Sequence, residues 1–293
     1  MTGRRGFGGV GAAIIPVSFA AALLAAGTAF GDPAGGVGTV VAVRCPSPAA
    51  LVRIEPELGR VATHLAAHRP IKIIAIGSSS TEGVGATASG LSYPSQLERD
   101  LRVRLPGAEI QVLNRGKGGE DAGEELARLG RDVLAEHPDL VIWQVGTNAV
   151  LRRDDLAADA ELLQRGIEQI VAAGADVVLM DLQYAPRVLA RPAYALMEQV
   201  IADTAERDHV ALFRRFEMMR YWQTEPAAVP ATIGGDGLHM NDIGYGCLAA
   251  ALADALVANW SAEVKSATRH PATASPSGMA ADRPNVTGTA SLR

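Results

Sequence analysis

The sequence has no excess of positive charge: 27 lysine and arginine residues stand against 32 aspartate and glutamate residues, a formal net charge of −5. Proteins that bind the phosphates of nucleic acids or anionic lipids present basic patches that neutralise those charges. Aromatic residues are also scarce, at 4%, although 293 residues suffice to bury a full core. The composition therefore indicates an ordinary globular protein and disfavours nucleic acid as a partner.

Cysteine is almost absent, since Cys45 and Cys247 are the only two. Neither lies in the N-terminal region where a lipid would be attached, so we do not expect a lipid-anchored form. Outside the cytoplasm the two thiols can form one disulfide that ties the start of the domain to its last helix. Two separate thiols are the alternative, and sequence spacing does not decide between them.

The chain also lacks a recognisable set of metal ligands. His64 and His68 lie four residues apart in a helical pattern, a spacing that suits one metal ion, but no third ligand lies nearby. We therefore expect both histidines to face solvent, and we predict neither a metal nor a cofactor.

The first 31 residues have the features of an export signal. Arg4 and Arg5 precede an uncharged stretch over residues 6–31, and small residues at positions 28–31 provide a cleavage region. The arginine pair partly matches a twin-arginine signal. An uncleaved membrane anchor is the alternative, but the Ala/Gly-rich stretch is only weakly hydrophobic. We expect cleavage, no stable membrane insertion, and a periplasmic or extracellular protein.

From residue 49 onward, helical patterns alternate with apolar runs of strand length. Alternating strands and helices with short links predict parallel pairing with helices on both faces of the sheet. The fold class is therefore α/β, a three-layer α/β/α sandwich with a five-stranded parallel sheet. The expected strands are 71–76, 110–113, 140–145, 177–181 and 210–213, and the expected helices are 49–68, one with Pro94 in its first turn, 121–136, 156–173, 191–207 and 242–259.

This pattern divides the chain into four parts. Residues 1–31 are the expected signal peptide, and the Gly/Val/Pro-rich residues 32–47 are a linker. Residues 48–260 form the α/β domain. Residues 261–293 are rich in Ser, Ala, Thr and Pro without apolar periodicity, and are predicted to be a disordered tail.

Polar and glycine-rich segments follow the predicted strands. They are residues 77–81 (Gly-Ser-Ser-Ser-Thr), 114–120, 146–148 (Gly-Thr-Asn) and, before the last helix, 236–239 (Asp-Gly-Leu-His). In a parallel sheet such segments converge at the carboxyl edge. A serine, an Asp/His pair and donors for an oxyanion are the groups that acyl transfer requires.

These four segments, in this order, resemble the motif blocks of the SGNH (GDSL-type) hydrolase superfamily. The resemblance implies a flavodoxin-like sandwich and a serine hydrolase without cofactor. Ser79 falls on the nucleophilic serine, Gly119 on the glycine whose N–H faces the oxyanion, and Asn148 on the asparagine of Gly-x-Asn. Asp236 and His239 fall on the closing Asp-x-x-His. Each motif alone arises by chance, whereas four in order, in these structural contexts, form a strong signal.

Two positions depart from the family pattern. Ser78 replaces the usual aspartate before the nucleophile, and Ala149 replaces the acidic residue that often follows Gly-x-Asn. Neither change removes a catalytic group, but both alter the polarity of the pocket and hence bear on its substrate.

The chemistry assigns a role to each matching residue. His239 is the expected base that accepts the proton of Ser79, and Asp236 is expected to orient its ring. The N–H groups of Ser79 and Gly119 and the amide of Asn148 are expected to form the oxyanion hole.

Three other protein classes share part of this pattern. An ordinary α/β-hydrolase needs Gly-x-Ser-x-Gly, but Thr81 occupies the last position and Ser79 follows the first strand of the domain. A nucleotide-binding module is indicated by Gly-x-Gly-x-x-Ala at 83–88, which lies several residues beyond the strand, while Asn114 stands where an acidic residue is expected. A non-catalytic ligand-binding protein on the same fold is the third, and the complete Ser/Asp/His set argues against it.

We therefore predict an exported, monomeric serine esterase that forms an acyl-enzyme on Ser79. The resemblance implies substrates among acetylated sugars, aryl esters, lysophospholipids and thioesters, and export favours small-molecule or carbohydrate esters. From loop position, Tyr184, Arg187, Trp222 and Met240 are expected to line the pocket.

Overall fold

The computed structural model describes residues 45–152, 155–224 and 229–269, and the predicted signal peptide lies outside them. The described chain forms a five-stranded parallel sheet in the order β2-β1-β3-β4-β5. The predicted α/β class and strand number are confirmed. The strands are β1 (Ile71–Gly77), β2 (Ile110–Gly116), β3 (Leu140–Gln144), β4 (Asp176–Met180) and β5 (Ala211–Phe213).

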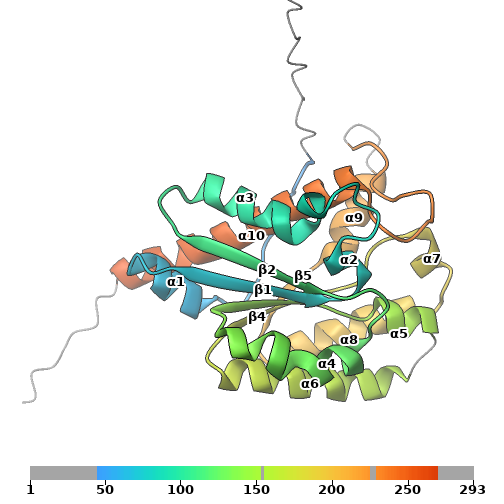
Figure 1. Ribbon diagram of the computed structural model, residues 1–293, viewed down its shortest axis with the longest axis horizontal. Helices are drawn as coiled ribbons and strands as arrows, with labels where there is room; N and C mark the ends of the chain where they lie inside the picture. Colours follow the sequence, from blue (N-terminus) through green and yellow to red (C-terminus); the bar gives the residue numbers. More distant parts are fainter. Residues whose placement is uncertain (1–44, 153–154, 225–228, 270–293) are drawn as a thin grey trace, which may run out of the picture. The chain divides into compact units, whose positions relative to one another are not determined.

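Helices cover both faces of the sheet (Figure 1). One face packs against α1 (Gly59–Ala66), α3 (Tyr93–Arg104), α9 (Arg215–Thr224) and α10 (Asp242–Arg269). The other packs against α4 (Ala122–Asp132), α6 (Leu156–Ala172) and α8 (Tyr194–Arg207). Short helices at the strand ends are α2 (Ser79–Glu82), α5 (Thr147–Arg152), α7 (Pro186–Leu189) and the 3₁₀ turns η1 (Ser89–Leu91) and η2 (Leu134–Glu136).

Both faces of each strand are apolar because both are covered. Successive strand side chains point to opposite faces, so Ile73 and Ala75 join the core beneath α3 and α10, while Ile74 and Ile76 join the core on the α4, α6 and α8 side. All four side chains are fully buried. The continuous apolar runs that predicted the strands are the consequence.

The strand order has a switch point at the centre of the sheet. The chain runs from β1 to β2 on one side and to β3 on the other, so the order reverses between β1 and β3. In open α/β sheets, ligands bind beyond the carboxyl ends of the strands at such a switch point. The segments that follow β1 and β3 begin at Ser78 and Val145, next to the candidate nucleophile and the Gly-x-Asn motif.

The helix expected over residues 49–68 is only half present. Residues 49–58 are not helical, and α1 starts at Gly59. Pro56 supplies no N–H and disfavours a helical residue before it. Ile54 and Leu58 are nevertheless buried, and Asn259 of α10 holds their segment by donating to the Ile54 carbonyl (3.0 Å) and accepting from the Leu58 N–H (2.9 Å). The apolar spacing therefore identified buried residues correctly but not their conformation.

Helix α10 is longer than predicted and belongs to the core. It continues to Arg269, so the prediction of a disordered tail is wrong for residues 261–269, a segment without glycine or proline. Residues 242–262 are apolar and long enough to cross a membrane, but two thirds of the most apolar window (67%) is buried inside the fold. This stretch is thus the central helix of one layer, packed against α3 and the sheet.

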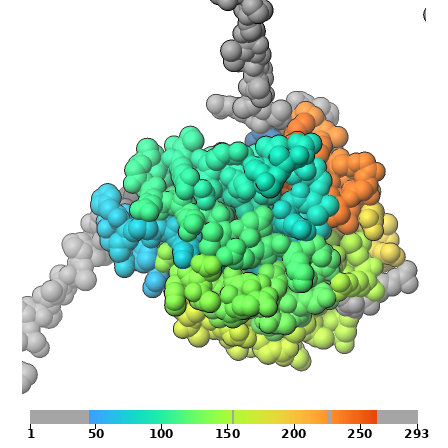
Figure 2. Space-filling view, viewed as in Figure 1, coloured from blue at the N-terminus to red at the C-terminus, as the bar shows by residue number. Residues whose placement is uncertain are grey.

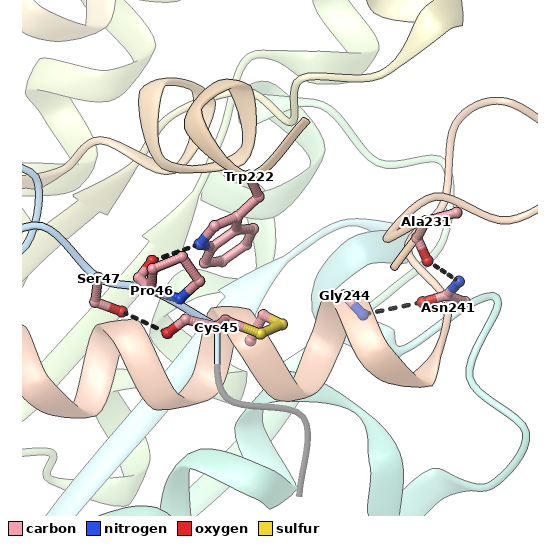
Figure 3. The surroundings of a disulfide bond; sticks show 8 residues. Cys45, Pro46, Ser47, Trp222, Ala231, Asn241 and Gly244 are labelled. Atoms are coloured by element: carbon pink, nitrogen blue, oxygen red, sulfur yellow. Dashed lines mark hydrogen bonds between the residues drawn. A yellow bond between two sulfur atoms is a disulfide. The ribbon is translucent and has the colours of Figure 1, made fainter. Parts of the chain in front are cut away.

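A disulfide fixes the start of the domain. Cys45 and Cys247 are bonded, with their Cα atoms 5.3 Å apart, which decides between the two arrangements that the sequence left open. Beside this bond the Trp222 indole N–H donates to the Pro46 carbonyl at 2.8 Å (Figure 3). The predicted linker therefore ends before residue 45, and residues 45–47 are part of the domain.

Candidate active site

The turn from β1 into α2 presents Ser79 at the edge of the sheet. Ser79 is the first residue of α2 and is half-buried. The turn requires a glycine at position 77, because a Cβ there would lie 2.4 Å from the Thr81 hydroxyl and 2.9 Å from the Gln144 side chain. Ser79 therefore lies two residues beyond the carboxyl end of β1, a central strand of the sheet.

Gln144, the last residue of β3, stabilises this turn by hydrogen bonds. Its side-chain oxygen accepts hydrogen bonds from the Ser78 N–H, the Ser78 hydroxyl and the Thr81 hydroxyl, each at 3.2 Å. Gln144 is 1% exposed, so these bonds form away from water. Ser78, which replaces the aspartate of the SGNH motif, thus points into the protein and binds a neutral amide. Gln144 was not singled out in the sequence, because nothing in a buried strand indicates which turn its end will meet.

The segment 236–239 brings a base to the serine. The His239 Nε2 atom lies 2.9 Å from the Ser79 Oγ atom, and the Nδ1 atom of the same ring is hydrogen-bonded to the Asp236 carboxylate. The other carboxylate oxygen accepts from the backbone N–H groups of Leu238 and His239, both at 3.0 Å. One tight turn thus fixes the aspartate and the imidazole together, and the three predicted triad residues form a continuous chain of hydrogen bonds.

The electrostatics of this turn keep Asp236 ionised. Burial alone would raise the pKa of Asp236, but the Leu238 N–H, the His239 ring and the His239 N–H all stabilise the carboxylate and lower the pKa to about 2. A carboxylate held in this way can stabilise an imidazolium on its neighbour.

The loop after β2 lies beside the serine. A Cβ on Gly118 would be 3.8 Å from the Ser79 Cβ, and Gly119 follows with a φ of +84°, a conformation that favours glycine. A Cβ on Gly119 would meet no atom within 4 Å. Among the described residues, no hydrogen-bond acceptor faces the Gly119 N–H. This donor is therefore available to a substrate.

Asn148, in the first turn of α5, reaches the same loop. Its side-chain N–H₂ group donates one hydrogen bond to the Glu120 carbonyl at 2.7 Å, which leaves its second hydrogen free of that bond. The predicted oxyanion residues Ser79, Gly119 and Asn148 thus lie on three segments that the switch point brings together: α2, the loop after β2, and α5.

Of the four residues predicted to line the pocket, two are buried in the core. Trp222 and Met240 are buried in the core, at 2% and 0% exposure, so the prediction that they line the pocket is wrong. Both are large apolar side chains that belong to the core on the α3 and α10 side of the sheet. Arg187 is exposed, and its N–H donates to the Gly237 carbonyl (3.0 Å) in the triad turn. Tyr184 is half-buried and packs edge-on against a neighbouring aromatic ring.

His64 and His68, the two histidines considered as metal ligands, differ in burial. His64 is buried rather than solvent-facing, with its Nδ1 atom 3.2 Å from the Asp139 carboxylate, whereas His68 is exposed. Asp139, the residue just before β3, supplies the polar partner that makes burial of His64 acceptable. Within the described ranges, no group of three or more His, Cys, Asp or Glu side chains is arranged to hold a metal ion.

The surface view shows where these segments meet. In Figure 2 the residues that follow β1 (teal) lie against the segment that contains the triad turn (orange), although Ser79 and His239 are 160 residues apart in the sequence. The candidate site is therefore at the surface, at the carboxyl edge of the sheet.

Comparison with known proteins gives consistent matches. Residues 44–262 match the model of the Non-GDSL lipase-like family. An arylesterase from Vibrio mimicus is 27% identical over 168 residues, which are 57% of this chain and 79% of that protein. An acetylxylan esterase from Geobacillus stearothermophilus is 34% identical over 93 residues, which are 29% of this chain but only 42% of the relative.

Solved structures show the same fold. A two-domain esterase active on acetylated mannans aligns with a TM-score of 0.58 at 20% identity and covers 70% of this chain. The match extends over 54% of that protein, so this chain spans about half the length of the two-domain enzyme. A lipase/acylhydrolase from Enterococcus faecalis aligns with a TM-score of 0.55 at 27% identity, covering 63% of this chain and 94% of the other.

Proposed function

This chain belongs to the Non-GDSL lipase-like family and is a carboxylic ester hydrolase, and from that premise we propose that it acts through a covalent acyl-enzyme on Ser79. The observation that supports the proposal is the hydrogen-bond chain from Ser79 through His239 to Asp236. A serine hydroxyl becomes an effective nucleophile when an adjacent base accepts its proton, and the third group orients that base.

In the acylation step the Ser79 oxygen attacks the carbonyl carbon of the ester while its proton passes to the Nε2 atom of His239. The carbonyl oxygen becomes an oxyanion, which accepts hydrogen bonds from the N–H groups of Ser79 and Gly119 and from the Asn148 amide. When the tetrahedral intermediate collapses, the bond to the leaving alcohol breaks and the His239 imidazolium returns the proton to the alkoxide. The products are the free alcohol and an ester on Ser79.

Deacylation repeats these steps with water. His239 takes a proton from a water molecule, the hydroxide attacks the acyl carbon, and the same donors bind the oxyanion. Collapse returns the proton to the Ser79 oxygen and releases the carboxylic acid. Throughout the cycle the ionised Asp236 stabilises the imidazolium.

The substrate we propose is a short acyl ester, with an O-acetyl group on a carbohydrate as the leading case. Two of the similar proteins support this choice by name, one active on acetylated mannans and one an acetylxylan esterase. A similar arylesterase makes small aryl esters the alternative. Hydrolysis of nitrophenyl esters of graded chain length tests the preference for a short acyl group. The value of kcat/KM should be highest for the acetate and decrease with each added methylene.

We also propose that the protein is exported and acts outside the cytoplasm as a monomer. The Cys45–Cys247 disulfide supports this location, since disulfides persist in oxidising compartments. Mass spectrometry of the protein isolated from its native host tests the proposal. An N-terminus near Asp32 in the extracellular or periplasmic fraction is the expected result, and an intact N-terminus in the cytosol would oppose it.

A further inference from the structure

The loop that carries Gly119 uses almost all of its backbone hydrogen-bonding groups. Three of the four N–H groups in residues 117–120 donate within the protein: Lys117 to the Gly77 carbonyl (2.9 Å), Gly118 to the Glu82 carboxylate (2.8 Å) and Glu120 to the Lys117 carbonyl (3.4 Å). Within the described part of the chain, only the Gly119 N–H of this loop has no protein partner. The loop is thus held so that a single donor remains for the substrate.

Two side chains of α5 hold the carbonyl groups of the same loop. Asn148 donates to the Glu120 carbonyl at 2.7 Å, and Arg152 donates from one terminal nitrogen to the Gly119 carbonyl at 2.5 Å. These two residues are four apart in the sequence and therefore lie on one face of the helix. One helical face thus binds two consecutive carbonyl oxygens immediately after the exposed N–H.

Arg152 also ties the loop to the next helix. Its second terminal nitrogen pairs with the carboxylates of Asp121 and Glu124, the latter at 3.1 Å. Asp121 and Glu124 form the capping box at the start of α4. The guanidinium therefore joins three elements through its planar fork of donors: α5, the loop and α4.

From these contacts we infer that Arg152 is a positioning residue for catalysis, which sets the direction of the Gly119 N–H without touching the substrate. The inference rests on the proposed function, because the orientation of this donor matters only if an oxyanion forms there. Gly119 is a glycine at φ +84° with no side chain to restrict rotation of its flanking peptides. The Glu82 carboxylate fixes the peptide before the donor, and Arg152 fixes the peptide group after it.

The ordinary alternative is a surface ion pair. The Arg152 side chain is 42% exposed, and exposed pairs contribute about 0–1 kcal/mol to stability. An ion pair of that kind would leave the turnover rate unchanged. A positioning residue would change the turnover rate and leave stability nearly unchanged, so the two roles separate experimentally.

The test compares Arg152→Gln and Arg152→Lys with wild type, using nitrophenyl acetate. Misplacement of a catalytic group by about 1 Å costs roughly 100-fold in rate, so we expect Arg152→Gln to lower kcat about 10- to 100-fold. KM should stay within twofold, because the ground-state ester makes little use of the oxyanion donors. Arg152→Lys should recover part of the loss, since one ammonium can still reach the Gly119 carbonyl.

A matched control and a binding measurement complete the design. Arg165→Gln removes an arginine that is also about half exposed and pairs with Glu161 on α6, and it should leave kcat unchanged. Affinity for a boronic acid, which mimics the tetrahedral intermediate, should weaken in Arg152→Gln by a factor similar to the loss in kcat. A melting temperature within a few degrees of wild type should accompany both variants.

Failure of the positioning role and failure of the proposed function give different results. If Arg152→Gln keeps more than half of the wild-type kcat, or if its loss lies in KM, the positioning role is wrong even though Ser79→Ala is inactive. If Ser79→Ala retains wild-type activity, the proposed function itself is wrong. If Arg165→Gln loses as much activity as Arg152→Gln, the effect is one of general surface charge and the inference is overturned.

Discussion

At the scale of single residues, the proposed chemistry depends on the His239 imidazole, which lies between the Ser79 hydroxyl and the Asp236 carboxylate. Asp236 accepts two backbone N–H bonds and one ring bond, and its pKa is about 2. This pKa is below the value of an unfolded aspartate, so the carboxylate favours the folded state above about pH 4 and this contribution is lost as the pH falls towards 2. In the working range of an esterase, Asp236 is therefore always charged.

This state of Asp236 predicts the shape of the pH profile. The acid limb of kcat/KM should fall no more steeply than tenfold per pH unit, because Asp236 stays ionised there and adds no protonation step of its own. The profile between pH 4 and 8, measured with nitrophenyl acetate, checks this. A fall of a hundredfold per unit would mean that two groups titrate together and that Asp236 is not fixed as a carboxylate.

The variant Asp236→Asn tests the same residue directly. An amide cannot stabilise the imidazolium and favours the wrong tautomer, so kcat should decrease by about 10²- to 10⁴-fold. Steady-state kinetics measure this loss, and circular dichroism should show unchanged folding. Full activity in this variant would show that the aspartate has no part in the reaction.

The sequence predicted which residues the structure brings together at the site, because each lies in a short motif directly after a strand or before the last helix. It did not locate the residues that hold them. Gln144 and Arg152 act on backbone and hydroxyl groups of segments that are distant in sequence, Ser78 and Gly119. Only the fold brings these partners together. The four-residue spacing of Asn148 and Arg152 does indicate that both lie on one face of a helix.

At the scale of elements, strands were predicted more accurately than helices. The strands are buried on both faces, so their apolar runs are unbroken. Helix patterns share their apolar spacing with buried irregular chain, which is why residues 49–58 were assigned wrongly. Helix α9 was not predicted at all, although its Met218, Met219 and Trp222 side chains are buried.

The packing of α6 gives an element-scale prediction with an internal control. A Cβ on Gly166 would lie 2.2 Å from the ring of the buried Trp143, whereas one on Gly130 of α4 would meet nothing within 4 Å. Gly166→Ala should destabilise the protein by about 1–3 kcal/mol through overpacking. Gly130→Ala should be neutral or stabilise it by about 0.5–1 kcal/mol, because alanine is the better helix former. Urea unfolding of both variants measures the difference, and equal effects would contradict the packing described here.

At the scale of the whole molecule, one covalent bond closes the domain. Cys45 and Cys247 are 202 residues apart, so the disulfide encloses almost the entire fold. The same contact region includes the Trp222 to Pro46 hydrogen bond, which attaches the N-terminal segment to α9 (Figure 3). The sequence permitted this bond but could not supply the Cα separation that makes it geometrically possible.

Loss of this bond should destabilise the protein without abolishing catalysis. Removing a native disulfide typically costs about 2–5 kcal/mol, so the Cys45→Ser/Cys247→Ser variant should melt well below wild type. At 25 °C its kcat should remain close to wild type, since the hydrogen bonds that join the triad run through Ser79, His239 and Asp236 and involve neither cysteine. Thermal unfolding of wild type with and without reductant gives the matching control. Equal melting temperatures in all three samples would mean that the bond does not form in solution.

The covalent step on Ser79 is the centre of the account, and active-site labelling tests it most directly. A fluorophosphonate reacts with a serine only when a base activates it, and peptide mapping by mass spectrometry then identifies the modified residue. We predict a single adduct on Ser79, formed at the rate at which esterase activity disappears, and no adduct in His239→Ala. An active preparation that carries its label on another residue, or that resists labelling while it hydrolyses nitrophenyl acetate, would contradict the account.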